Sequence, residues 1–144
     1  MSSLRACAII AALLGGLSFA TARHAAPIGT WLTQKGDAHI RISYCGKALC
    51  GTVVWLKDPY DHKTGKPPVD EQNPDSRLRR RLILGLRIFA MIADSHGGWS
   101  GSIYNSDDGQ TYRGKLILRS AGWLEVDGCA GFVCGHEMWR KVGR

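Results

Sequence analysis

Hydrophobic and polar residues alternate along most of this chain in short runs that are typical of β-strands. In the run from His39 to Tyr44, every second residue is apolar or aromatic, as expected for a strand with one face in solvent. The chain holds 18 glycines, and they separate the runs every few residues. This spacing favours the turns of an antiparallel sheet over helices. The pattern therefore predicts an all-β fold.

Eight short strands follow from this pattern. They span Ile28 to Leu32, His39 to Tyr44, Leu49 to Leu56, Leu86 to Ile92, Trp99 to Tyr104, Thr111 to Leu118, Trp123 to Asp127, and Glu137 to Val142. The segment from Leu82 to Ala93 is apolar enough for a short helix, but Gly85 and its branched residues favour a strand. Eight antiparallel strands in up-and-down order predict a small closed β-barrel, because closure removes both exposed sheet edges.

One connection breaks this rhythm. Residues 57–81 contain four of the five prolines and many charged side chains. A connection of this length inside a compact domain is usually functional or poorly ordered. We therefore expect residues 57–81 to form a lid or a docking edge at the open end of the barrel.

The N-terminus has the layout of a signal peptide. Arg5 precedes an uncharged stretch that is apolar from Cys7 to Leu17, which is too short for a membrane-spanning helix. Small residues then predict cleavage after Ala22, with Ala20 as the alternative. Residues 1–22 are thus a predicted signal peptide, and residues 23–144 form one predicted domain of a periplasmic or secreted protein. Arg5 also argues against a lipid anchor at Cys7.

Charge adds little to this picture. The full chain has a net charge of +7, and removing residues 1–22 takes away only Arg5, so the mature charge is 18 − 12 = +6. A positive balance favours contact with anionic surfaces, but it equally serves solubility.

Four cysteines remain after the predicted cleavage, namely Cys45, Cys50, Cys129 and Cys134. An even number in an exported chain predicts disulfides, because the compartment is oxidising. We favour the pairs Cys45–Cys50 and Cys129–Cys134, since each flanks a turn-like tetrapeptide. Pairing between the two hairpins is the main alternative, and a zinc site is the other.

Several motifs occur together in one order. They are Gly29-Thr-Trp31, Cys45-Gly-x-x-Leu-Cys-Gly-x-Val-Val-Trp55, Asp70-x-x-Asn73-Pro, Leu84-Gly-Leu86, Trp99-x-Gly-x-Ile-Tyr104, Asp108-Gly-x-x-Tyr112 and Trp139-x-Lys-Val142. This order resembles the exported bacterial family named domain of unknown function 2147, over essentially the whole mature chain. The resemblance implies a calycin-like, lipocalin-type barrel and no assigned activity.

Gly29-x-Trp31 also looks like the opening motif of lipocalins. In such barrels a tryptophan of the first strand plugs the closed end, and an arginine lies over its ring in a cation–π contact. The resemblance assigns these structural roles to Trp31 and to Arg140, which stands on the predicted last strand.

Aromatic residues are the candidate ligand-binding groups, in particular Trp55, Trp99, Tyr104 and Tyr112. Aromatic side chains at a barrel mouth suit an apolar or ring-shaped ligand. The alternative is that they fill the interior, because side chains alone can occupy an eight-stranded barrel.

The run Arg77-Leu-Arg79-Arg80-Arg81 is the candidate anion-binding segment. Arginine pairs with phosphate or carboxylate in a two-point geometry, so anionic lipid head groups or polymers of the envelope are candidate partners. The alternative is pairing with the upstream acids Asp70, Glu71 and Asp75. Nucleic acid is not expected, because export removes the usual substrate.

Candidate catalytic residues are few. No serine stands in a G-x-S-x-G motif, and no cofactor or metal site is predicted from the scattered histidines. His62 beside Asp61 and His136 beside Glu137 leave a hydrolase as a minor alternative. The leading hypothesis is a non-enzymatic barrel that binds a small amphipathic ligand or a surface partner at its open end. The second is a solid barrel that contacts anionic envelope components through its arginines.

Overall fold

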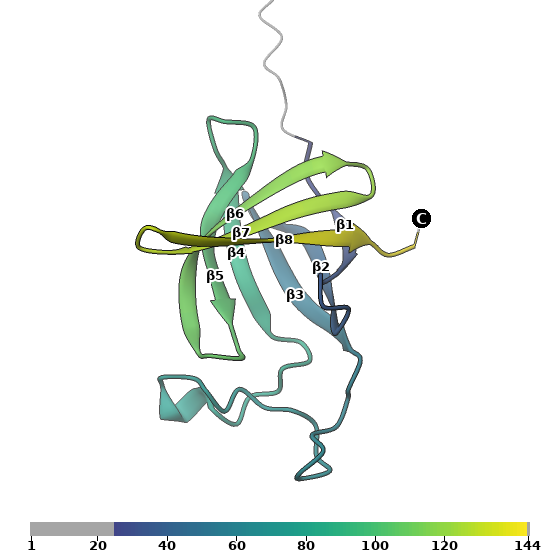
Figure 1. The fold of residues 1–144 in the computed structure, drawn as a ribbon, viewed down its shortest axis with the longest axis vertical. Coiled ribbons are helices and arrows are strands. Elements are labelled where there is room, and N and C mark those ends of the chain that lie inside the picture. Colours follow the sequence, from purple (N-terminus) through teal and green to yellow (C-terminus); the bar gives the residue numbers. More distant parts are fainter. Residues whose placement is uncertain (1–24, 144) are drawn as a thin grey trace, which may run out of the picture.

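Eight antiparallel strands close into a barrel in the computed structural model, which describes residues 25–143 (Figure 1). The strands are β1 (Gly29–Leu32), β2 (Ala38–Cys45), β3 (Ala48–Leu56), β4 (Arg87–Ala93), β5 (Trp99–Asn105), β6 (Gln110–Ser120), β7 (Trp123–Ala130) and β8 (Val133–Lys141). Each strand pairs with the next along the chain, and β8 pairs back with β1. The predicted all-β barrel is confirmed. The predicted signal peptide lies outside the described residues.

The strands lie close to their predicted positions, with one informative difference at the start of β8. β8 begins at Val133 instead of Glu137, because Cys134 lies directly opposite Cys129 in the β7–β8 ladder and leaves only a tight turn between them. The segment from Leu82 to Ala93 is a strand from Arg87 onward, as the branched residues favoured. The long connection also contains a single 3-10 turn, η1 (Ser76–Leu78).

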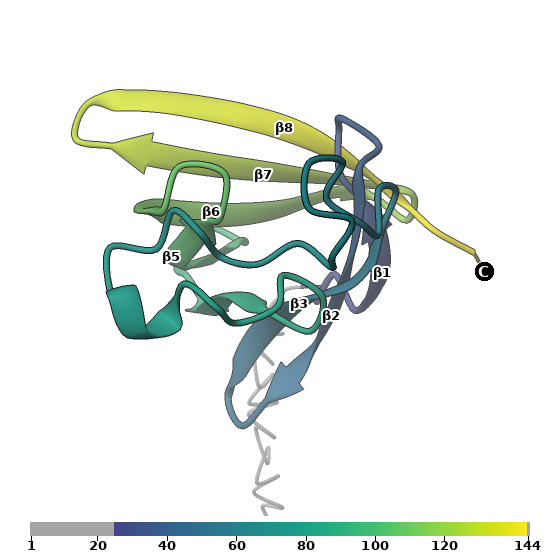
Figure 2. The same cartoon turned by 90° about the horizontal axis from the view of Figure 1, so that it is seen from below.

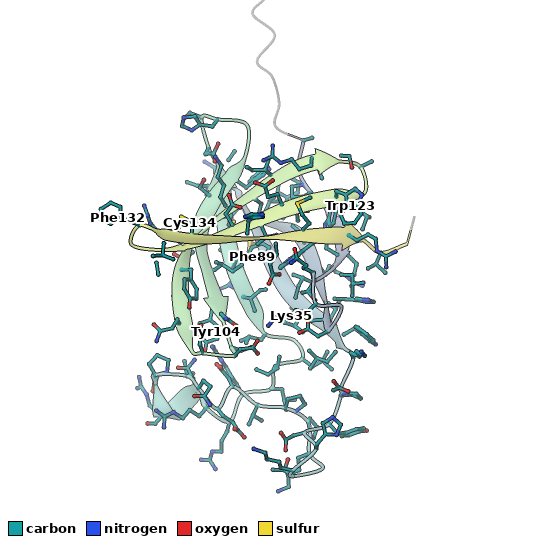
Figure 3. The ribbon with its side chains drawn as sticks, in the orientation of Figure 1. Lys35, Phe89, Tyr104, Trp123, Phe132 and Cys134 are labelled. Carbon is teal, nitrogen blue, oxygen red and sulfur yellow. A yellow bond between two sulfur atoms is a disulfide. The ribbon has the colours of Figure 1, made fainter. Side chains whose placement is uncertain are left out.

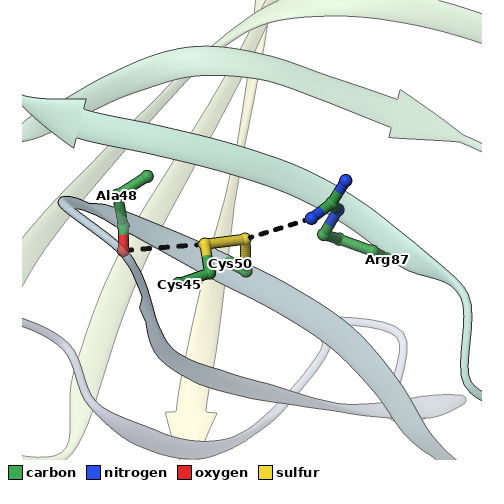
Figure 4. The surroundings of a disulfide bond; sticks show 4 residues. All are labelled: Cys45, Ala48, Cys50 and Arg87. Atoms are coloured by element: carbon green, nitrogen blue, oxygen red, sulfur yellow. Dashed lines mark hydrogen bonds between the residues drawn. A yellow bond between two sulfur atoms is a disulfide. The ribbon is translucent and has the colours of Figure 1, made fainter.

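Both disulfides have the predicted pairing, Cys45–Cys50 and Cys129–Cys134. Each closes the turn of one hairpin, β2–β3 or β7–β8. Cys129 and Cys134 lie directly opposite each other in the ladder, whereas Cys45 and Cys50 bond diagonally, because Cys45 pairs with Ala48 and Cys50 with Ser43. Figure 4 shows the first bond, with the Arg87 guanidinium 3.8 Å from the Cys50 sulfur. Since the thiols are consumed by these bonds, the crossed pairing and the zinc alternative are excluded.

The closed half of the barrel is filled by large apolar side chains. Trp31, Leu49, Met91, Leu116 and Leu124 have no solvent exposure at all. They come from strands far apart in the sequence and meet on the axis because alternate residues of each strand point inward. The interior of this half is therefore a packed core.

The seam between β1 and β8 closes the barrel with only two paired positions, Trp31 with Lys141 and Leu32 with Arg140. Residues directly opposite each other in a ladder share a face. The cation over Trp31 is therefore Lys141, whose ammonium lies 4.8 Å from the ring centroid and donates to the Ile28 carbonyl. The role assigned to Arg140 was wrong by one position, since Arg140 is exposed on the opposite face.

Local sequence around the seam fits this contact. The indole nitrogen of Trp31 donates to the Pro27 carbonyl at 2.8 Å, which fixes the ring across the closed end. Gly29 has a φ of +128°, and a Cβ at that position would meet the Lys141 side chain. The Gly-x-Trp motif thus leaves room for the lysine that covers the tryptophan.

We expect Lys141→Ala to lower the free energy of unfolding by about 1 kcal/mol, through loss of the cation–π contact and the hydrogen bond to Ile28. Arg140→Ala is the matched control, and its stability should stay near that of the parent because Arg140 touches neither group. Urea denaturation of both variants makes the comparison. Equal losses would contradict the assignment of Lys141.

Candidate functional site at the open end of the barrel

Four connections gather at one end of the barrel, because consecutive strands run in opposite directions. They are the turns β1–β2, β5–β6 and β7–β8 and the long connection between β3 and β4. In Figure 2, which views the molecule from below, the long connection crosses in front of this end. We call residues 57–86 the cover segment. No helix within residues 25–143 has the length and apolar content needed to cross a membrane.

A cavity of about 910 Å³ opens at this end, beneath the cover segment. Apolar side chains from six strands and the cover segment form much of its wall. They include Ile40, Val53, Ile83, Ile103, Val126 and Trp139. Carboxylates stand along the wall and at the mouth, namely Asp37, Asp58, Asp107, Asp127 and Glu137. The space is large enough for a small organic ligand.

Asp70 attaches the cover segment to the barrel. Its side chain is fully buried and accepts hydrogen bonds from the Tyr104 hydroxyl at 2.6 Å, the Asn73 amide at 2.8 Å and the Arg81 guanidinium at 2.7 Å. Tyr104 belongs to β5, and Figure 3 shows it at the end of the barrel that faces the cover segment. The motif Asp70-x-x-Asn73 therefore serves to fasten the segment across the mouth.

Burial would raise the pKa of Asp70, but the hydrogen bonds from Tyr104, Asn73 and Arg81, and the positive charge of Arg81, outweigh it and lower the pKa. Burial and the Asp70 carboxylate raise the pKa of Tyr104 in turn. The Arg81 guanidinium also lies 5.4 Å from the centre of the Tyr104 ring. The four side chains form one polar unit with the Asp70 carboxylate at its centre.

Backbone contacts reinforce this attachment. Gly85 donates to the Val53 carbonyl at 2.8 Å, and Val53 donates to the Leu86 carbonyl at 3.0 Å. Gly109, in the β5–β6 turn, has a φ of +71° and lies so close to Gln72 that a Cβ would strike the Gln72 carbonyl. The cover segment therefore contacts β3 at its C-terminal end and the β5–β6 turn at Gln72.

Glu137 and Trp139 place a carboxylate inside the cavity. Both lie on the inward face of β8, since Glu137 pairs with Val126 and Trp139 with Leu124, two buried residues. The indole nitrogen of Trp139 donates to Oε2 of Glu137 at 2.7 Å. This bond fixes the carboxylate on the cavity wall.

The mouth carries further polar pairs. Lys35 and Asp107 lie 3.6 Å apart and join the β1–β2 turn to the β5–β6 turn. The Tyr112 hydroxyl donates to Asp108 at 2.6 Å, which raises the pKa of Tyr112. Burial raises the pKa of Asp127, with the nearby Glu125 carboxylate adding to the effect.

Two of the four predicted ligand-binding aromatics line the cavity, Tyr104 and Tyr112. The other two do not. Trp99 is buried in the closed half, where it is core. Trp55 is turned outward because a bulge at Val54 pairs it with His39, on whose ring it stacks at 4.3 Å.

Glu137 and Trp139 were not predicted as ligand-binding residues. The signal that could have identified them is the alternation along β8, in which Gly135, Glu137 and Trp139 occupy every second position. With Trp139 taken as an interior residue, period-two alternation places Glu137 on the same face.

Three of the four candidate anion-binding arginines contact other groups of the cover segment. Arg77 pairs with Asp75 at 2.8 Å, Arg81 with Asp70, and Arg79 donates to the Asn73 carbonyl at 2.7 Å. Pairing with the upstream acids, the expected alternative, is therefore observed for Asp70 and Asp75. Contact of these arginines or of Arg80 with an anionic partner stays a prediction.

The two histidines of the minor hydrolase alternative, His62 and His136, are both exposed. His62 lies 3.9 Å from Asp58, and both side chains are largely exposed. His136 is exposed and faces Asp127 across the β7–β8 ladder. Within residues 25–143, neither histidine is hydrogen-bonded to a serine, threonine or cysteine side chain that could act as a nucleophile.

Comparison with known proteins gives a family and a fold. Residues 29–141 match the family model described as "Uncharacterized protein conserved in bacteria (DUF2147)". Among solved structures, the chain is similar to protein HP1028 from Helicobacter pylori, described as belonging to the lipocalin family, with a TM-score of 0.66. Sequence identity is 20%, over 81% of this chain and 82% of that one, so the likeness concerns the fold. No curated protein matches the chain.

We expect Asp70→Asn to lower the free energy of unfolding at pH 7 by about 3 kcal/mol, because it leaves the Arg81 charge without its buried partner. Since the folded-state pKa of Asp70 lies below the ordinary 3.8, its stabilising effect is full above that value and is lost as pH falls through the lower pKa. The difference between parent and variant should therefore shrink below pH 3.8 in urea denaturation. Asp75→Asn is the control and should cost much less, because its partner Arg77 is largely exposed to water. A difference that stays constant with pH would contradict the ionised state of Asp70.

Proposed function

We propose that this chain, which belongs to the bacterial family DUF2147, is a non-enzymatic binding protein that holds a small amphipathic ligand in the open end of its barrel. The observation that carries the proposal is the cavity of about 910 Å³ with apolar walls and a few fixed polar groups. Pre-formed, mostly apolar hollows of this size are the usual sites for small ligands.

The division of the interior supports the proposal. Side chains fill the closed half completely, whereas the open half keeps its space beneath a cover segment that is fastened by buried hydrogen bonds. A solid barrel would need no such cover. The lipocalin-like fold of the similar structure agrees with this arrangement, although fold alone does not establish function.

We further propose that the protein acts outside the cytoplasm. Two disulfides support this, since such bonds persist in oxidising compartments. The predicted signal peptide at residues 1–22 agrees with it. A ligand for this protein is then a molecule of the periplasm or of the medium.

Gly135→Trp tests the cavity directly. Gly135 lines the cavity on the inward face of β8, and a Cβ there would meet no atom within 4 Å, so a side chain can start from this position and its indole takes up space at the cavity wall. We expect this variant to weaken binding of the uncharged fluorescent probe N-phenyl-1-naphthylamine at least about tenfold. Fluorescence titration of the purified domain gives the affinity.

Ile92→Trp is the matched control for this experiment. Ile92 lies on the outer face of β4 with 62% of its surface exposed, so the same indole is added away from the cavity. Probe affinity should be unchanged in this variant. Equal binding by the parent and Gly135→Trp would show that the probe binds elsewhere and would remove the support for a ligand cavity.

A further inference from the structure

We infer that the ligand is an organic cation, with its ammonium group against Glu137 and its apolar body along the cavity wall. This inference rests on the proposed function and goes beyond it by fixing the sign of the ligand's charge. Three features of the cavity support it.

The first is the carboxylate of Glu137. Trp139 donates to Oε2 at 2.7 Å and holds the group in one orientation, while no donor among the described residues bonds to Oε1. The side chain is partly buried, so water only partly solvates its charge. A carboxylate in this position gains more from a cationic partner than an exposed one does, because the Coulomb interaction strengthens as water is removed.

The second feature is the balance of charge around the cavity. All 12 acidic residues lie within residues 25–143, and five of them line the cavity. Of the 16 lysines and arginines in the same range only Lys35 lines it, together with His136. That lysine is paired with Asp107 at the mouth. The chain as a whole is strongly basic, so the acidic lining is opposite to its average composition. A negatively charged ligand would be repelled at the position where a cation is attracted.

The third feature is the wall next to Glu137. Val126 lies opposite Glu137 in the β7–β8 ladder, and Trp139 adjoins it on the same face of β8. Ile40, Val53 and Ile103 continue the apolar surface across the barrel. Such a wall accepts an alkyl chain or a ring, and it places the polar end of the ligand at the single carboxylate on this inward stretch of β8.

Three ligands with the same ten-carbon chain test the inference, namely decylamine, decanol and decanoate. Each is titrated at neutral pH and below its own aggregation limit, by displacement of N-phenyl-1-naphthylamine from the parent protein. We expect decylamine to bind at least about tenfold more tightly than decanol, and decanoate to bind most weakly. Raising the salt concentration should reduce the advantage of decylamine.

Glu137→Gln identifies the residue responsible. The amide has the shape of the carboxylate and can still accept the Trp139 hydrogen bond, so the wall should remain intact. We expect the affinity for decylamine to fall about tenfold and that for decanol to stay the same. Glu71→Gln is the control, because Glu71 is an exposed carboxylate of the cover segment that does not line the cavity, and it should change neither affinity.

The outcomes separate the two levels of the proposal. If the parent binds all three ligands equally and Gly135→Trp abolishes their binding, the preference for a cation is overturned. The ligand-binding cavity then stays in place. Tightest binding of decanoate would likewise overturn it. If the parent binds none of the three ligands and Gly135→Trp leaves the affinity for N-phenyl-1-naphthylamine unchanged, the proposed function itself is overturned.

Discussion

Closure of the barrel between β1 and β8 is the constraint on which the rest of the structure depends. The seam has two paired positions, whereas the neighbouring β7–β8 ladder has eight. Without it, β1 and β8 would each present an open edge, and the inward faces would lose their common core. Lys141 strengthens the seam from inside, since it covers the Trp31 ring and bonds to the chain that leads into β1.

This closure also determines where a cavity can exist. Trp31 and the other large residues occupy the end at which β1 begins, so the remaining space lies at the opposite end. That end holds the cover segment, whose fastening through Asp70 replaces the packing that a filled interior would provide. Stability is thus concentrated in one half of the barrel and open space in the other, a distribution suited to binding.

Much of this architecture could be predicted from the sequence, because strand periodicity and hairpin spacing are local properties. The strands, the long connection and both disulfides follow from alternation, glycine positions and cysteine spacing. Register is not local. A shift of one residue exchanges the two faces of a strand. For this reason the bulge at Val54 turned Trp55 away from the cavity. The cation over Trp31 was placed at Arg140 because the lipocalin resemblance implies an arginine there, whereas the β1–β8 register pairs Trp31 with Lys141. Alternation along β8 places Glu137 on the face of Trp139, but Glu137 was overlooked because only the pairing of β8 with β7 shows that this face points inward.

The disulfides have a consequence for the biogenesis of this protein. In both bonds the two cysteines are separated by five positions along the chain. In an unfolded chain, the cysteine nearest to each thiol is therefore its native partner, because short loops close at the lowest entropic cost. Oxidation that precedes folding therefore favours the two native pairs over the crossed ones.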